Sequence, residues 1–240
     1  MQRSCNVRLA SVPASGTAGV RPARDVRRCR RAARRRGRAA RTLFSRATVA
    51  GVDDIARTAP DDAPTAPPPA VEPDVKDWTW VLERRCPECG FAAADVEPAE
   101  IGATVRDLVP RWVAVLHRPD ARERPAPSTW SALEYGAHVR DVMRVFDERV
   151  RAMVEEDDPL FANWDQDATA LEDRYDVQDP VVVADELATS AERTAARFDA
   201  VRDDQWQRAG RRSNGSVFTV RTLGQYFLHD VVHHLDDVRG

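Results

Sequence analysis

Lysine, cysteine and long apolar runs are scarce in this sequence of 240 residues. Lys76 is the only lysine among 36 basic residues, and four cysteines do not make the disulfide framework of a small secreted protein. No apolar run approaches the roughly 20 residues that span a bilayer, and no apolar signal core follows the N-terminal charges. We therefore expect a soluble cytoplasmic protein without a membrane segment.

Several signatures of enzyme classes are also missing. The sequence has no glycine-rich phosphate loop, no dinucleotide-binding fingerprint and no Ser/His/Asp arrangement that can be ordered along the chain. It has no internal repeat, and strand-like alternation of apolar and polar residues is not convincing. Helical periodicity and a few polar side chains are therefore the informative features.

Charge divides the chain into segments. Residues 1–50 contain fourteen basic residues and one acid, Asp25, and so carry a net charge of +13, whereas residues 51–240 carry −16. Because the first segment combines few large apolar residues with strong like-charge repulsion, we expect a disordered arm. Residues 51–76, rich in proline and aspartate, are typical of a linker. The folded domain is expected over residues 77–240.

The arginine-rich arm has several interpretations. Such a segment can bind nucleic acid or an anionic membrane, and an acid-poor N-terminus resembles an organellar transit peptide. We favour a translation start assigned too far upstream, because the abundance of arginine, alanine and proline is typical of a GC-rich coding sequence. Nucleic acid and membranes are therefore not expected as partners.

Helical periodicity dominates from residue 98 onward. Pro98 suits a first helical turn, Ser131 and Glu134 have capping-box spacing, and Asp179 followed by proline is a good N-cap. The predicted helices run from 98 to about 117, from 131 to about 155, from 179 to about 201, and from 219 or 222 to about 239. The sequence thus predicts an all-α four-helix bundle with a long connection between its second and third helices.

Three histidines are the main candidates for a metal site. His229 and His233 are four residues apart on the last predicted helix, so they project from nearly the same side, about one turn apart. His138 lies on the core-facing stripe of the second predicted helix. Three imidazoles leave a coordination position open for water, thiol or substrate. We predict a site of these three residues, whereas His234 is expected to point away and to be structural or supporting.

Parts of the sequence resemble the DinB/YfiT-like superfamily of bacterial four-helix-bundle metalloproteins. They are WSALEYGAHVRDV, WQRAGRRSNGSVFTV and LGQYFLHDVVHHLDDV, and the leading DWTWVLERRCPECGF resembles an actinobacterial branch. The resemblance covers residues 77–239. It implies an up-down-down-up bundle and a divalent metal, commonly zinc or nickel, bound by His138, His229 and His233.

The resemblance implies a thiol-dependent reaction. Some members are similar to S-transferases that join a low-molecular-weight thiol to an electrophile, and the actinobacterial likeness favours mycothiol. The metal would stabilise the thiolate. A metal-dependent hydrolase is the enzymatic alternative. A non-catalytic metal-binding or stress-responsive protein is an alternative of another class, and a homodimer is compatible with each.

Neighbouring polar residues are candidates for supporting roles. Asp141, Asp230 and Asp237 lie close to the histidines along their helices and could orient an imidazole, although a solvated helix charge is the simpler interpretation of each. The long connection adds Trp164, Asp165 and Asp167 as candidates for a substrate entrance.

Cys86 and Cys89 are the second chemical feature. The C-P-x-C-G turn that they form has the shape of a zinc knuckle, but a complete site needs two more ligands. A packing turn, a partial metal site and a redox pair are all compatible with the sequence, which does not distinguish among them.

Overall fold

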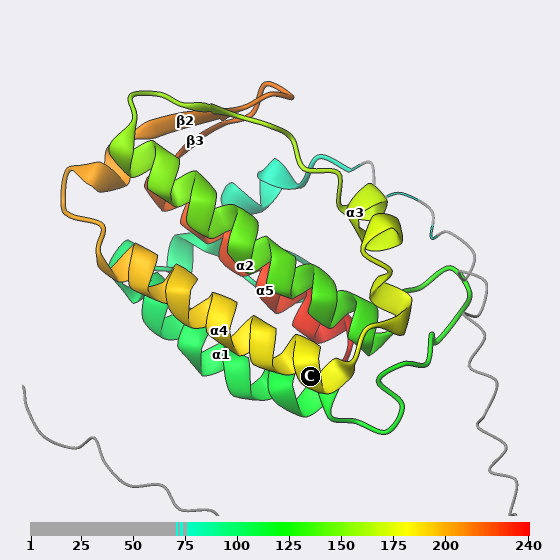
Figure 1. Ribbon diagram of the computed structural model, residues 1–240. Helices are drawn as coiled ribbons and strands as arrows, with labels where there is room; N and C mark the ends of the chain where they lie inside the picture. Colours follow the sequence, from blue (N-terminus) through cyan, green and yellow to red (C-terminus); the bar gives the residue numbers. More distant parts are fainter. Residues whose placement is uncertain (1–70, 72, 74–75) are drawn as a thin grey trace, which may run out of the picture. The chain divides into compact units, whose positions relative to one another are not determined.

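Four long helices make up most of the described chain. The computed structural model describes Val71, Pro73 and residues 76–240, so the arm expected over 1–50 and nearly all of the expected linker lie outside the described residues. The helices are α1 (Ile101–Leu116), α2 (Ala132–Glu155), α4 (Pro180–Asp199) and α5 (Val220–Asp237). They confirm the predicted all-α bundle (Figure 1).

Local capping chemistry explains where three of these helices begin. Ser131 Oγ accepts a hydrogen bond from the Glu134 backbone amide, and the Glu134 carboxylate accepts one from the Ser131 amide. Thr219 and Thr222 form the same reciprocal pair at the start of α5. Asp179 accepts hydrogen bonds from two backbone amides in the first turn of α4. The predicted starts therefore agree with the structure, because each one satisfies amides that the helix itself leaves unpaired.

The helices follow an up-down-down-up order. Figure 1 shows α2 and α4 running in one direction and α1 and α5 in the opposite one. α4 packs against α1 and α2, and α5 packs against the same two helices. Because α2 and α4 are parallel, the chain between them must return along the bundle. α2 has 24 residues and is about 36 Å long, so a long connection is a geometric requirement.

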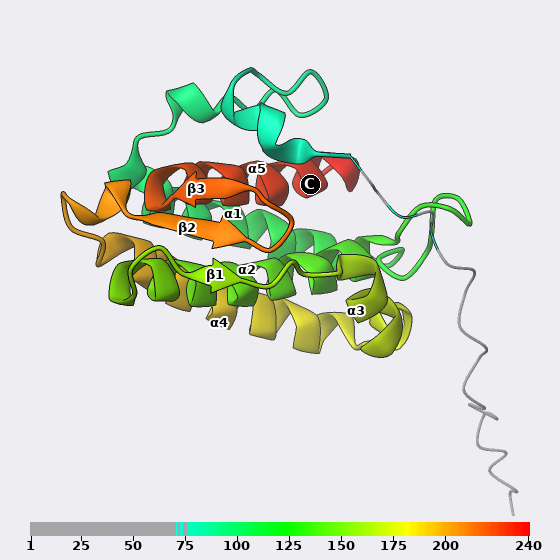
Figure 2. The same ribbon diagram turned by 90° about the horizontal axis from the view of Figure 1, so that it is seen from above.

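The returning segment contributes to a small sheet. It contains β1 (Leu160–Phe161), α3 (Gln166–Glu172) and the 3-10 turn η4 (Tyr175–Val177). β1 pairs in parallel with β2 (Ala209–Arg212), which pairs antiparallel with β3 (Val217–Thr219). Figure 2 shows the three strands side by side, with β3 leading into α5. Such short strands leave no recognisable alternation in the sequence. The Asn214–Gly215 turn signal does indicate that residues 210–215 could hold a short hairpin, and β2 and β3 form one there.

A segment without long helices precedes the bundle and packs on α5. We call residues 77–96 the N-terminal strap; it contains η1 (Trp78–Leu82) and η2 (Ala93–Asp95), and η3 (Pro98–Glu100) then leads into α1. From α5, Gln225 Nε2 donates hydrogen bonds to the carbonyl oxygens of Ala93, at 2.8 Å, and Val96, at 3.2 Å. The strap is thereby attached along α5 (Figure 2).

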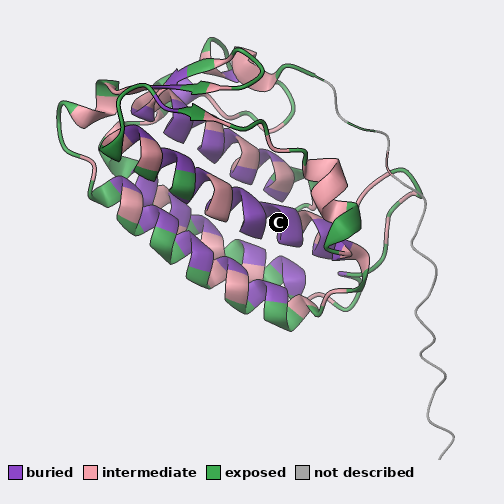
Figure 3. Ribbon diagram, turned by 45° about the horizontal axis from the view of Figure 1, so that its top comes forward, coloured by how far each residue is buried: buried purple, intermediate pink, exposed green. Residues whose placement is uncertain are grey.

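The bundle interior is mainly apolar, and several polar side chains are buried within it. Figure 3 shows the buried residues on the inward sides of the helices. The largest fully buried side chains include Trp112, Tyr175, Phe198 and Phe227. His138, His229 and His233 are buried as well. Among the described helices, none is both long and apolar enough to cross a membrane.

Candidate metal centre

Helix α5 presents two pairs of side chains that could bind a metal ion, each spaced by one turn. His229 and His233 form one pair, and Asp230 and His234 form the other. Because neighbouring positions on an α-helix are about 100° apart, the two pairs face different parts of the protein. One pair meets the strap, and the other meets His138 on α2.

His138, Asp230 and His234 form the first group of candidate ligands. One ligand atom of each lies within 4.8 Å of the other two. His138 Nε2 is 3.5 Å from Asp230 Oδ1, and His234 Nε2 is 3.8 Å from the same oxygen. Helices α2 and α5 thus bring three donor atoms close enough together to surround a single ion.

Buried atoms of this group lack the hydrogen bonds that burial demands. Among the described residues, both ring nitrogens of His138 and Oδ1 of Asp230 are buried without a hydrogen-bond partner. Each such atom costs about 1–3 kcal/mol when it is left unsatisfied. A divalent cation would satisfy one His138 nitrogen and the Asp230 oxygen together, so these residues fit a metal ion.

The charge states of this group suit a cation. Burial lowers the pKa of His138, so its imidazole is neutral at neutral pH. Burial by itself would raise the pKa of Asp230, but the nearby rings of His138 and His234 outweigh it and lower this pKa to about 2. Neutral imidazoles and ionised carboxylates are the forms that bind metals.

Neighbouring side chains hold the two imidazoles of this group. His234 Nδ1 lies 2.8 Å from Asp237 Oδ2. A proton on Nδ1 shared with this carboxylate leaves Nε2 as the metal-binding atom. The His138 ring is stacked on Trp164, with centroids 5.3 Å apart and planes 4° apart, and it also contacts the ring of Trp130.

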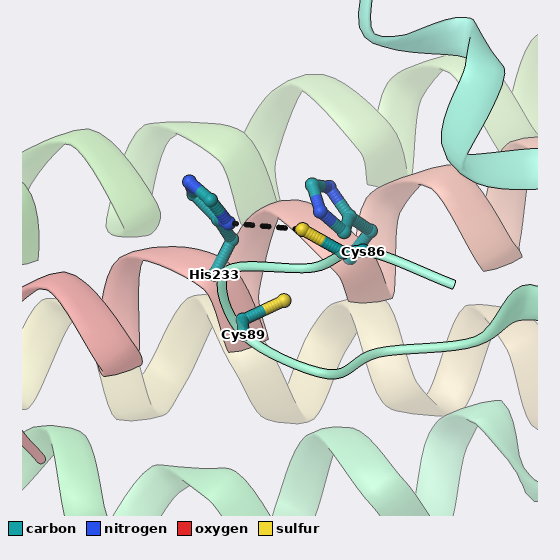
Figure 4. A group of neighbouring side chains, drawn as sticks. Cys86, Cys89 and His233 are labelled. Carbon is teal, nitrogen blue, oxygen red and sulfur yellow. Dashed lines mark hydrogen bonds between the residues drawn. The ribbon is translucent and has the colours of Figure 1, made fainter. Parts of the chain in front are cut away.

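Cys86, Cys89, His229 and His233 form the second group. One donor atom of each lies within 4.8 Å of the other three. Figure 4 shows both cysteines on one loop beside α5, with the Cys86 sulfur 3.8 Å from His233 Nδ1. Burial raises the pKa of Cys89 to about 11, and burial together with the neighbouring His233 lowers the pKa of His229 to about 4. Two sulfurs and two imidazoles therefore share a largely buried place.

The structure divides the predicted triad between these groups. His229 and His233 join the cysteines, whereas His138 joins Asp230 and His234. His234 does not point away as predicted, since its ring centroid is 4.9 Å from that of His138. The physical reason is the orientation of α5 in the bundle. The side of α5 that packs on α2 carries Asp230 and His234, each one residue after His229 and His233. Sequence reasoning treated Asp230 only as a supporting or solvated charge, although D-x-x-x-H repeats the spacing of H-x-x-x-H.

Asp141 is bound to arginines and a tyrosine rather than to an imidazole. Its carboxylate accepts hydrogen bonds from Arg140, Arg144 and the Tyr175 hydroxyl, the last at 2.6 Å. This network joins α2 to η4. Asp141 therefore stabilises the packing of η4 on α2 and does not orient a histidine of the candidate metal centre.

A cavity of about 740 Å³ opens beside both groups. Asp230, His234, His229 and His233 belong to its lining. The three residues considered for a substrate entrance, Trp164, Asp165 and Asp167, also line it. The first group therefore faces a space large enough for small molecules.

Comparisons with known proteins agree with this fold. A model of the DinB superfamily matches residues 102–238. YfiT from Bacillus subtilis, a solved structure described as "a probable metal-dependent hydrolase with an unusual four-helix bundle topology", is similar to 59% of this chain over 83% of its own. The TM-score is 0.51 and the identity 17%, so this likeness concerns the fold alone. The search of curated proteins found no match.

Proposed function

This chain belongs to the DinB superfamily, and from that premise we propose that it is a metal-dependent enzyme whose ion is held by His138, Asp230 and His234. One observation carries the proposal: three donor atoms converge beside a cavity of about 740 Å³, and buried atoms of His138 and Asp230 lack hydrogen-bond partners among the described residues. Three protein ligands leave at least one coordination position open, which is the arrangement of catalytic rather than structural metal sites.

The reaction that we assign is the transfer of a low-molecular-weight thiol of the mycothiol type to an electrophile. A divalent cation, zinc or nickel, supplies the Lewis acidity that lowers the pKa of a thiol. The sulfur forms a bond to an electrophilic carbon, the leaving group departs with the electron pair of the broken bond, and the thiol proton passes to solvent. The nucleophile is therefore the small thiol and not a side chain.

The side chains around the first group have separate tasks in this reaction. His138 and His234 provide ring nitrogens, and Asp230 provides one negative charge. Asp237 holds the His234 ring in the orientation that directs Nε2 inward. Trp164 covers the His138 ring and keeps water from it. A cation with one carboxylate ligand keeps a net positive charge, which favours a thiolate beside it.

The cavity lining supports a hydrophilic thiol. Hydroxyl and amide side chains can exchange hydrogen bonds with a hydroxyl-rich molecule, and aromatic rings can pack against its C–H faces. The lining contains both kinds: Thr129, Asn163, Gln166 and Asn214 together with Trp78, Trp130 and Trp164. A thiol that carries sugar-like groups suits this surface better than an apolar one.

A metal-dependent hydrolase is the second candidate. The same ligand set supports the activation of water, and the carboxylates of Glu88, Asp165 and Asp167 line the cavity, where one could accept a proton. YfiT, which has the same fold, is described as such an enzyme. The two candidates differ in one requirement, since only the transferase needs a thiol.

The test is an assay of the zinc- or nickel-loaded full chain with a fluorogenic bimane electrophile, with and without mycothiol. We expect turnover only with the thiol, and a rate at least 100-fold lower in Asp230→Ala because the ligand set is incomplete. Asp203→Ala, at an exposed position outside the cavity, is the matched control and should keep the full rate. Turnover without thiol would favour the hydrolase, and a full rate in Asp230→Ala would refute the proposed centre.

A further inference from the structure

The loop between the two cysteines has the form of a metal-binding turn. The Cys86 amide donates a hydrogen bond to the Phe91 carbonyl oxygen at 2.8 Å, and the Gly90 amide donates one to the Cys86 carbonyl oxygen at 3.0 Å. Gly90 has φ +74°, which a residue with a side chain rarely adopts. This tight reversal places both cysteines on the side of the loop that faces α5 (Figure 4).

The donor set and its spacing correspond to a closed zinc site. In tetrahedral coordination, zinc lies about 2.3 Å from sulfur and about 2.0 Å from nitrogen, which separates a sulfur from a nitrogen by roughly 3.5 Å. The Cys86 sulfur and His233 Nδ1 are 3.8 Å apart, and the four donor atoms all lie within 4.8 Å of one another. Little rearrangement would bring them onto one ion.

Charge and hydrogen bonding point the same way. Two thiolates, two neutral imidazoles and one divalent cation make a neutral assembly, which can be buried at little electrostatic cost. Among the described residues, His229 Nε2 is buried without a hydrogen-bond partner. His233 Nε2 lies 3.4 Å from a carboxylate oxygen of Glu88, from the same loop, which leaves Nδ1 to face the sulfur.

We propose that Cys86, Cys89, His229 and His233 bind a second, structural divalent ion, zinc by preference, that fastens the N-terminal strap to α5. With four protein ligands this site has no open position, unlike the group around His138. The inference does not depend on the proposed reaction, because it concerns other donors and another role.

The ion also fixes one wall of the cavity. Trp78, in the strap, lies with its ring centroid 5.5 Å from that of His229 and 5.0 Å from that of His233, and it lines the cavity. Loss of the ion would free the loop that carries the cysteines. The second site would thus hold an aromatic wall in place beside the first group.

Cobalt(II), titrated into the metal-free full chain under reducing conditions, tests the proposal. Cobalt bound to thiolates gives an intense near-ultraviolet charge-transfer absorption that a histidine and carboxylate site cannot give. We expect this absorption to saturate at one equivalent per chain and to be at least tenfold weaker in Cys86→Ser/Cys89→Ser. The matched control, Cys5→Ser/Cys29→Ser, removes the other two cysteines and should keep it. Asp230→Ala should keep it as well, which separates this result from the fate of the proposed reaction.

A second measurement covers the case in which the double variant does not fold. X-ray absorption at the zinc edge of the wild-type protein should show sulfur neighbours at about 2.3 Å. Absence of thiolate absorption in wild type, its full retention in Cys86→Ser/Cys89→Ser, or only nitrogen and oxygen around zinc would overturn the proposal. So would a Cys86–Cys89 disulfide in freshly purified, metal-free protein, since that result would identify a redox pair.

Discussion

His138→Phe should abolish metal binding at the first group and yet make the metal-free protein more stable. In wild type, both ring nitrogens of His138 are buried without a hydrogen-bond partner among the described residues. Phenylalanine has a similar shape and can keep the stacking on Trp164, but it has no polar atom to leave unsatisfied. We expect metal affinity at this group to fall at least 100-fold. The free energy of unfolding without metal should rise by at most about 1–3 kcal/mol, because the variant also loses the His138 ring that lowers the pKa of Asp230.

The measurement combines metal titration with urea unfolding in the presence of a chelator. His117→Phe is the matched control, because His117 is exposed and its ring is paired with the Val113 carbonyl oxygen. That variant should keep its metal and show no gain in stability. A metal-free His138→Phe protein that is less stable than wild type, or that still binds metal as tightly, would contradict the role given to His138.

Asp141→Asn is expected to cause a large loss of stability with no direct effect on metal ligation. The carboxylate is 11% exposed and is bonded to Arg140, Arg144 and Tyr175. Breaking a buried charge pair of this kind costs roughly 3–5 kcal/mol. Because Arg140 keeps Glu186 as a partner, we expect a loss near the lower end, about 3 kcal/mol at pH 7.

The effect of Asp141→Asn should depend on pH in a defined direction. Burial tends to raise the pKa of Asp141, but the hydrogen bonds from Arg140 and Tyr175 outweigh it, and the pKa lies below the ordinary value of 3.8. A lowered carboxyl pKa contributes stability that is present above pH 3.8 and is lost as the pH falls through the lower, folded-state value. The difference between wild type and variant should therefore narrow below pH 3.8.

Urea unfolding of the metal-free proteins across this pH range checks the prediction. Asp185→Asn, at an exposed position on α4, should change stability by no more than about 0.5 kcal/mol. A loss under 1 kcal/mol for Asp141→Asn, or a loss that grows as the pH falls, would show that the network contributes little.

The helices could be predicted because their information is local. Ser131 with Glu134, and Asp179 before proline, satisfy helix amides within a few residues, so the sequence contains the whole argument. The three short strands could be predicted only in part, because the Asn214–Gly215 turn signal indicates the β2–β3 hairpin but nothing local indicates β1. β1 pairs with β2 across about fifty residues, and a strand of two to four residues has no period to recognise.

The candidate metal ligands could be predicted from the sequence only in part, for a different reason. A helix shows that His229 and His233 share a side, but not which neighbour covers that side. The strap covers it, through a loop whose Cys86 is 147 residues from His233. The adjacent side of α5, which carries Asp230 and His234, faces α2. A rotation of about 100°, decided by packing and not by periodicity, separates the predicted triad from the two groups observed.

The two groups are linked through α5 itself. His229 precedes Asp230, and His233 precedes His234, so one helix carries ligands for both. An ion held by the strap cysteines restrains the helix turn that presents Asp230 and His234. Stability of the closed site and geometry of the open one are therefore expected to vary together.

The most direct test of the central claim is to locate bound metal in crystals of the zinc-loaded protein by anomalous scattering at the zinc edge. The account predicts an ion bonded to His138, Asp230 and His234 with its remaining coordination directed into the cavity. An ion held jointly by His138, His229 and His233, or no ion beside His138, would contradict it.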